Sequence, residues 1–324
     1  MLYRLVLCAG LLWSGVALAA DVVDATGRTV AVPDHVASVL PAGPPAAVLL
    51  AAIAPDLMLG WPGPLSDQAR AYLDPSAAKL PVVPRLTGRE DVTAKVQALH
   101  PDLILDYGTI SPRYADLART TQQHTGIPTI LLDGALPEIP AVLRSVGKIL
   151  HREARAETLA TLAEAILALP LGQDHPHVLY ARGPDGLAVA APGTDVTEVF
   201  AHLGWQVVAP GGEGTFRFAT VDEIRTLDPD IVIFADPAMR EGVMHDPAWR
   251  SVRAVQSGHA LISPAMPFGW VEEPPSINRL LGLAWLEGRD PVILAAVFNA
   301  VVYGRALSGA QLDSVVAGVP TVQP

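Results

Sequence analysis

Residues 134–170 constrain the fold most, because they form one helical pattern of about thirty residues without an evident break. Apolar side chains recur at intervals of three and four residues, at Ile139, Val142, Leu143, Val146, Ile149, Leu150, Leu159, Leu162, Ile166 and Leu169. This spacing is typical of a helix with one buried face. Pro137 and Pro140 suit the first turn of such a helix, and Pro170 forbids its continuation. A helix of this length would span roughly 45 Å, so the pattern predicts a rod that joins two lobes.

Strands and helices alternate on both sides of this stretch, and the alternation contains an internal echo. Residues 96–105 and 224–233 share an amphipathic helix, a Leu-x-Pro-Asp corner and a buried strand. The echo predicts an α/β fold with two Rossmann-like lobes connected by a single long helix. We assign residues 20–135 to the first lobe, 136–170 to the linking helix and 171–324 to the second lobe. Ligands bind outside the carboxyl ends of strands in such sheets, so a ligand cleft is expected between the lobes.

The first nineteen residues have the pattern of a secretory signal peptide rather than of the fold. Arg4 precedes an uncharged apolar run, and Ala17-Leu18-Ala19 is a small-x-small cleavage site. Removal of residues 1–19 leaves twenty-one Lys and Arg against thirty-three Asp and Glu, a net charge of −12. So acidic a chain disfavours nucleic acid as a partner. Cys8 is the single cysteine, and the mature chain therefore forms no disulfide. A periplasmic location is expected.

Aromatic and arginine side chains at strand ends are the candidate ligand contacts. They are Trp61, Tyr107, Arg182, Phe268 and Trp270. Aromatic faces and guanidinium groups are a common way to hold a flat or anionic chelate. We expect the cleft to be flanked by Trp61 and Trp270. The alternative is that each aromatic side chain fills the end of its own lobe.

The common catalytic and metal-binding signatures are missing from the sequence. It has no Gly-x-Ser-x-Gly elbow, no His-Glu-x-x-His and no Walker loop. A secreted α/β enzyme of the hydrolase type remains the alternative function. Ser263, Ser276 and His259 are then the nearest candidates, although nothing in the sequence joins them. A third possibility is a protein that only carries a partner, such as a sensor co-receptor.

Five parts of the chain carry a resemblance to a known family. They are residues 22–33, 98–105, the long helical stretch, 227–233 and 267–286. Together they resemble the periplasmic substrate-binding proteins of the iron-complex and vitamin B12 type, the receptors of ABC importers. The resemblance covers almost all of the mature chain, and 267–286 is its most specific part. It implies small lobe motion, because a helix is a stiffer connector than two or three strands.

The resemblance also implies a function and partners. The protein is expected to bind an iron chelate, a siderophore or haem, or a related metal complex, and to deliver it to a permease. No bond is made or broken, no resident cofactor is implied, and a monomer is expected. The family docks through one acidic residue on each lobe, near the start of the helix before each corner. Asp222 occupies that position in the second lobe. Ala94 replaces the acid in the first lobe, where Glu90 or Asp91 can substitute.

Overall fold

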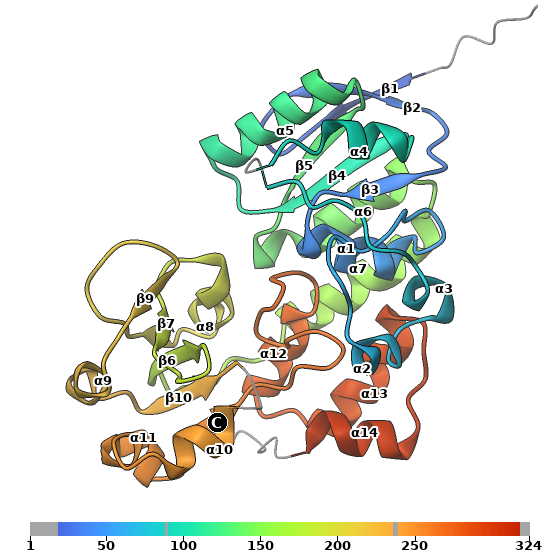
Figure 1. Cartoon of the computed structure of the whole chain (residues 1–324). Coiled ribbons are helices and arrows are strands. Elements are labelled where there is room, and N and C mark those ends of the chain that lie inside the picture. Colours follow the sequence, from blue (N-terminus) through green and yellow to red (C-terminus); the bar gives the residue numbers. More distant parts are fainter. Residues whose placement is uncertain (1–18, 88–89, 236–238, 318–324) are drawn as a thin grey trace, which may run out of the picture.

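The chain is represented by a computed structural model that describes residues 19–87, 90–235 and 239–317. It has two lobes, each built around its own sheet, in successive parts of the chain (Figure 1). The predicted signal peptide, residues 1–19, lies outside the described residues except for Ala19. No helix within the described ranges is long and apolar enough to cross a membrane.

The first lobe contains a parallel sheet in the order β3-β4-β5. The strands are Val39–Pro41, Leu103–Gly108 and Thr129–Asp133. Successive side chains of β4 point to opposite faces of the sheet. Leu105 belongs to the core that includes helix α1 (Pro44–Ile53), whereas Ile104 belongs to a smaller core with helix α4 (Thr93–Ala98). Both faces are therefore covered, which explains why these strands are apolar almost throughout.

Five further elements complete this lobe. They are β1 (Ala19–Val23), β2 (Thr29–Pro33), α2 (Asp67–Arg70), α3 (Pro75–Ala78) and α5 (Pro112–Thr125). Strands β1 and β2 pair antiparallel and form a hairpin. Met58 and Trp61 form isolated bridges, to Val39 and Val82 respectively.

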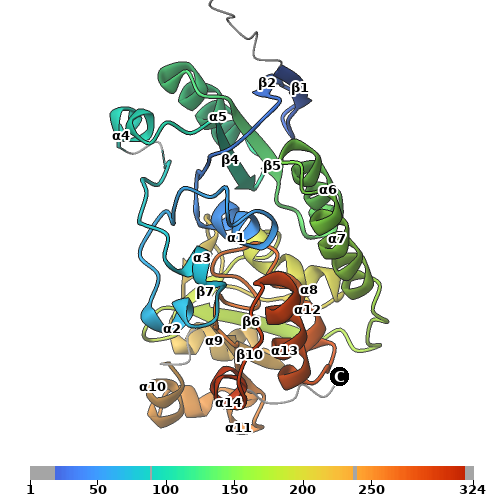
Figure 2. The same cartoon turned by 90° about the vertical axis from the view of Figure 1, so that its right-hand side faces the viewer.

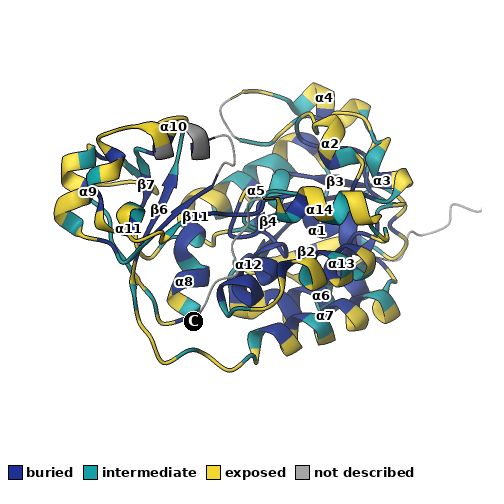
Figure 3. Cartoon of the chain, turned by 90° about the horizontal axis from the view of Figure 1, so that it is seen from below, coloured by how far each residue is buried: buried dark blue, intermediate teal, exposed yellow. Residues whose placement is uncertain are grey.

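The second lobe contains a mixed sheet of six strands in the order β11-β10-β6-β7-β9, with β8 beside β6. The strands are β6 (His177–Arg182), β7 (Ala188–Ala190), β8 (Gln206–Val207), β9 (Phe216–Phe218), β10 (Ile231–Phe234) and β11 (Ala260–Ile262). The helices are α8 (Glu198–His202), α9 (Val221–Leu227), α10 (Met239–His245), α11 (Arg253–Gln256) and α12 (Arg279–Leu286). Short 3-10 turns precede α8 (η2, Asp195–Thr197) and α11 (η3, Trp249–Ser251). Helix α12 is buried along its whole length (Figure 3).

The aspartates of the two Leu-x-Pro-Asp corners accept equivalent backbone hydrogen bonds in the two lobes. Asp102 accepts hydrogen bonds from the backbone N–H groups of Ala37 and Ser38, both at 2.9 Å, just before β3. Asp230 accepts one from the N–H of His177, at 2.8 Å, at the start of β6. Each corner aspartate thus fixes the neighbouring parallel strand, and the predicted internal echo is a structural one.

The expectation of one uninterrupted helix over residues 136–170 is wrong. The stretch contains a 3-10 turn, η1 (Leu136–Glu138), followed by α6 (Ile139–Ile149) and α7 (Glu153–Leu167). The chain turns back at His151, whose φ of 53° is left-handed. Helices α6 and α7 therefore pack side by side (Figure 2).

The fold-back is held by one arginine on α6 and two acids on α7. Arg144 donates to Glu157 at 2.7 Å and also forms an ion pair with Glu164, twenty residues further along the chain. A straight helix would hold residues 144 and 164 roughly 30 Å apart. At the turn the backbones approach closely, because a Cβ on Gly147 would lie 2.3 Å from that of Ala156.

Helix α7 leads from the first lobe to the second and contacts both α1 and the end of the chain. Arg155 on α7 donates to the carbonyl of Ala52 on α1 and to that of Val302 on α13, both at 2.9 Å. Helices α13 (Pro291–Val302) and α14 (Gly309–Val316) follow α12.

The last helices, which lie within residues 171–324 assigned to the second lobe, also contact residues of the first. Asn299 donates to the carbonyl of Tyr72 at 2.8 Å, and the Tyr72 hydroxyl donates to that of Gln311 at 3.2 Å. The chain therefore returns to the segment around α2 and α3 (Figure 1). This packing is a second tie between the two halves.

Candidate ligand-binding cleft

Two glycine residues lie close together at the carboxyl ends of the first-lobe strands. The Gly134 N–H, just after β5, donates to the carbonyl of Gly108, at the end of β4, at 2.8 Å. A Cβ on Gly134 would lie 2.6 Å from Cα of Gly108. The close approach of these two strand ends therefore requires glycine at position 134.

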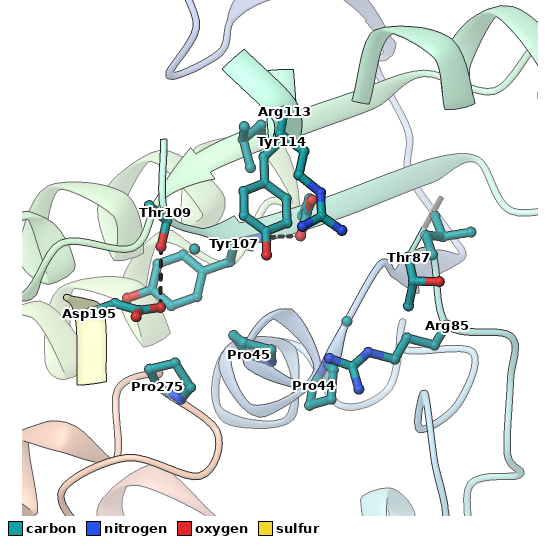
Figure 4. A pocket seen from close by; sticks show the side chains of 15 residues that line it. Pro44, Pro45, Arg85, Thr87, Tyr107, Thr109, Arg113, Tyr114, Asp195 and Pro275 are labelled. Carbon is teal, nitrogen blue, oxygen red and sulfur yellow. Dashed lines mark hydrogen bonds between the residues drawn. The ribbon is translucent and has the colours of Figure 1, made fainter. Parts of the chain in front are cut away.

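Two adjoining pockets lie between the lobes at these strand ends. The first, here called the arginine pocket, has a volume of about 310 Å³ (Figure 4). Its first-lobe lining includes Arg85, Thr87, Asp106, Tyr107, Arg113 and Tyr114, and Asp195 and Pro275 line it from the second lobe. The second, here called the seam pocket, has a volume of about 420 Å³ and shares four lining residues with the first, Gly108, Thr109, Asp195 and Pro275. Both pockets lie where the cleft was expected, between the lobes at the carboxyl ends of the strands.

Two exposed arginines dominate the first-lobe side of the arginine pocket. Arg113 reaches into it from the start of α5, and Arg85 reaches in from the loop before α4 (Figure 4). Neither forms an ion pair with a carboxylate of the described residues, although eight other arginines do. The positive end of the α1 dipole also faces the pocket, because Gly43, Pro44 and Pro45 line it. This wall is suited to an anionic group.

Asp106 provides the opposite charge in the same pocket. Burial raises its pKa to about 6, against the lowering effect of a hydrogen bond from the Tyr107 N–H at 2.9 Å. It is therefore mostly ionised at neutral pH. Tyr107 lines the pocket too, but its hydroxyl is buried without a hydrogen-bond partner among the described residues, and burial raises its pKa.

The seam pocket is bounded by an ion pair of the second lobe, and both of its members also bond to residues outside that lobe. Arg279, which is fully buried, donates to Glu198 at 2.7 Å and also to the carbonyl of Gly134. The other Glu198 oxygen accepts from the Leu136 N–H at 2.9 Å. Thr109 donates across the seam to Asp195 at 3.2 Å. The acids of this pocket are thus engaged with protein groups.

The prediction that Trp61 and Trp270 flank the cleft is wrong. Trp270 is 0 % and Trp61 3 % exposed, and neither lines the two pockets described above. The Trp61 ring lies 5.7 Å from that of Phe268, which lies 5.7 Å from that of Tyr303. Trp61 of the first lobe and Phe268 of the second therefore pack together at the junction with the C-terminal helices, so they do not each fill the end of their own lobe.

Arg182 lies at the end of β6 as predicted, but its guanidinium is already engaged. It forms ion pairs with Glu272, at 3.3 Å, and with Glu273, and it lies over the ring of Phe216. Glu272 is itself buried and accepts from the Tyr180 hydroxyl at 3.3 Å. Of the five predicted ligand contacts, only Tyr107 lines the arginine pocket.

The remaining candidate residues are distributed over both lobes. Asp222, exposed in the first turn of α9, forms an ion pair with Arg225 at 2.9 Å. Asp91 accepts from the Thr93 N–H at the start of α4, and this bond lowers its pKa. Glu90 is exposed beside it.

The serines suggested for an enzyme are buried. Ser263 is 1 % and Ser276 0 % exposed, and Ser276 donates to the carbonyl of Pro45. His259 lies instead within 3.3 Å of Ser257. The described residues also contain no cluster of three or more His, Cys, Asp or Glu that could hold a metal ion.

Sequence reasoning missed Arg85, Arg113 and Asp106. Two of them carried a usable signal. Asp106 directly precedes Tyr107 at the end of a buried strand, and Arg113 begins the helix that follows that strand. Arg85 carried none, since it lies in an irregular loop far from the strand ends in sequence.

The fold and cleft are those of a periplasmic binding protein. The sequence matches the periplasmic binding protein family over residues 45–265, more than half of the chain, and the chain belongs to this family. The resemblance seen in the sequence is confirmed at this level. No curated protein matches the chain.

Solved structures of similar shape support the same fold. An ABC transporter solute binding protein from Sulfurospirillum deleyianum DSM 6946 has a TM-score of 0.82 and 21% identity, covering 92% of this chain and 99% of that one. A periplasmic solute binding protein from Veillonella parvula DSM 2008 gives 0.70 and 19%, over 93% and 98%. The molybdate periplasmic binding protein MolA of Haemophilus influenzae, bound to molybdate, gives 0.68 and 14%, over 89% and 99%. Such low identities establish the fold and leave the ligand open.

Proposed function

We propose that the protein is the exported receptor of an ABC importer and binds an anionic metal chelate, such as an iron siderophore or haem, in the arginine pocket. The observation that carries this proposal is the presence of Arg85 and Arg113 in the pocket without an acidic partner among the described residues. Unpaired cations in the cleft of a chain with net charge −11 favour an anionic ligand. Molybdate, the ligand of one structural neighbour, is also an anion.

The size of the site fits a chelate better than a small oxyanion. Pockets for small molecules typically have volumes of about 300–1,000 Å³. The arginine pocket and the adjoining seam pocket, about 310 and 420 Å³, lie within that range. A chelate whose acid groups meet the arginines can extend toward the seam, where Thr109 and Asp195 line both pockets.

Export and delivery complete the proposal. Residues 1–19 serve as a cleaved signal peptide, which places a monomeric receptor in the periplasm. The exposed acids Asp222, Glu90 and Asp91 then meet basic residues of the permease, since complementary charge steers such encounters. No covalent step is involved.

Substitution of the pocket arginines tests the proposal. The mature protein is titrated with ferric siderophores, haem, cobalamin, nickel-histidine and molybdate, with thermal unfolding and calorimetry as readouts. A ligand at a hundredfold excess over its Kd stabilises the fold by about 2.7 kcal/mol. Arg85→Ala and Arg113→Ala should each weaken the chelate that binds by about tenfold or more, because each removes a charge-assisted hydrogen bond.

Arg119→Ala is the matched control. Arg119 lies on the same helix as Arg113 but forms an ion pair with Asp116 on an exposed surface, so its loss should leave affinity unchanged. Absence of any shift with the whole panel, or equal affinity in all three variants, would contradict the proposal.

A further inference from the structure

Asp106 is an acidic residue in the same pocket as Arg85 and Arg113, which are proposed to bind an anion. It lies on β4, opposite Leu131 of β5, and lines the arginine pocket. No ion pair joins it to Arg85 or Arg113 within the described residues, and no arginine contributes to its pKa. A carboxylate in this position repels an anionic ligand unless the ligand offers it a proton to share.

One oxygen of Asp106 is free to accept such a bond. Oδ1 accepts from the Tyr107 N–H at 2.9 Å, whereas Oδ2 has no hydrogen-bond donor among the described residues. Oδ2 is not among the side-chain atoms sealed in the interior without a partner. It therefore opens onto the pocket that Asp106 lines.

Two other acids of the cleft have both oxygens engaged, and a third, Asp133, lines the seam pocket and not the arginine pocket. Both oxygens of Glu198 are taken, one by Arg279 and one by the Leu136 N–H. Asp195 accepts from Thr109 and from the N–H of Val196, and Asp133 accepts from the N–H of Ala135. Asp106 is the acid whose free oxygen lies in the same pocket as the two arginines.

We propose that Asp106 selects the ligand: the cleft takes an anion that also carries a hydroxyl or N–H group, which donates to Asp106 while its acid groups meet Arg85 and Arg113. This inference rests on the proposed function and narrows its ligand class. An anion without a hydrogen-bond donor leaves the partly buried carboxylate of Asp106 unpaired and is repelled by its negative charge. Sites built around such a hydrogen bond reject ligands that lack the donor.

A matched pair of acids tests the selection. Citrate and tricarballylate carry the same three carboxylates and differ in one hydroxyl group. Calorimetry in metal-free buffer at pH 7.5 measures both affinities for the mature protein. The wild type should bind citrate at least about tenfold more tightly than tricarballylate, the loss expected for one hydrogen bond to a charged group.

Two substitutions separate hydrogen bonding from charge. Asp106→Ala removes the hydrogen-bond acceptor, so the preference of this variant for citrate over tricarballylate should fall below about twofold. Asp106→Asn keeps a carbonyl oxygen of the same shape and removes the charge, so it should retain a preference and bind both acids more tightly. Circular dichroism and thermal unfolding confirm that each variant folds; the isosteric Asn variant keeps the test decisive if the Ala variant does not.

Three outcomes overturn the inference: equal wild-type affinity for the two acids, a full preference that persists in Asp106→Ala, or no binding of either acid at millimolar concentration. These outcomes are distinct from failure of the proposed function. Arg85→Ala and Arg113→Ala should weaken both acids equally and leave the preference intact. If metal chelates bind but citrate and tricarballylate bind with equal affinity, Asp106 does not select the ligand, and the proposed receptor function still stands.

Discussion

At the scale of single residues, Asp106 shows how burial alters the chemistry of one side chain. Its folded-state pKa of about 6 lies above the ordinary value of 3.8. The folded protein therefore holds this proton more tightly than the unfolded chain between about pH 4 and pH 6. Its contribution to stability is present below this window and is lost as pH rises through the folded pKa. At neutral pH the ionised carboxylate of Asp106 therefore lowers the free energy of unfolding.

Asp106→Asn should consequently stabilise the ligand-free protein at pH 7.5 and have little effect at pH 4. A shift of this size corresponds to at most about 3 kcal/mol, and the partial exposure of the side chain reduces the expected gain to about 1–2 kcal/mol. Urea unfolding of both proteins at pH 4, 6 and 7.5 measures the difference. A constant difference across the three pH values would show that burial does not perturb Asp106.

At the scale of elements, the α6–α7 turn depends on a small residue at position 147. In a helix interior, Gly→Ala normally stabilises by about 1 kcal/mol. At Gly147 the new methyl group would instead meet Ala156 across the turn. Gly147→Ala should therefore destabilise the protein by about 1–3 kcal/mol, the usual cost of an overpacked contact.

The double variant Gly147→Ala with Ala156→Gly provides the matched test. It restores space, so it should recover most of the lost stability even though Ala156→Gly alone costs about 1 kcal/mol through helix propensity. Chemical denaturation of the four proteins gives the coupling free energy. Strict additivity of the two substitutions would mean that α6 and α7 do not pack at this point.

At the scale of the whole molecule, Arg279 is the residue on which the two lobes converge. It is buried on α12, and it joins Glu198 of the second lobe to the Gly134 carbonyl of the first. Arg279→Ala should destabilise the protein by about 3–5 kcal/mol, because it leaves a partly buried carboxylate and a buried carbonyl without their donor. Urea unfolding measures this loss.

Arg289→Ala is the corresponding control, since Arg289 follows α12 but is exposed. It should change the free energy of unfolding by less than about 0.5 kcal/mol. A loss below about 1 kcal/mol for Arg279→Ala would indicate that other contacts, such as those of Arg155, hold the lobes together without it.

Local sequence patterns predicted the elements well where one face or both faces of an element are apolar. The paired corners at Asp102 and Asp230 were visible because the same ten-residue pattern occurs twice. The turn within residues 136–170 was not predicted, although the apolar stripe changes to the opposite face of a continuous helix between Leu150 and Leu159, which are nine residues or about two and a half turns apart. Its signal was the absence of a large apolar residue between Leu150 and Leu159, together with Gly147.

The sequence by itself determined the α/β class, the two lobes and the family, because these depend on periodicity and on repeated local patterns. Only the tertiary structure decided that Trp61 and Trp270 are core residues and that Arg85, Arg113 and Asp106 form one pocket. The physical reason is that burial and charge pairing arise between segments far apart in the chain. A tryptophan at a strand end has the same local sequence whether it faces a ligand or another helix.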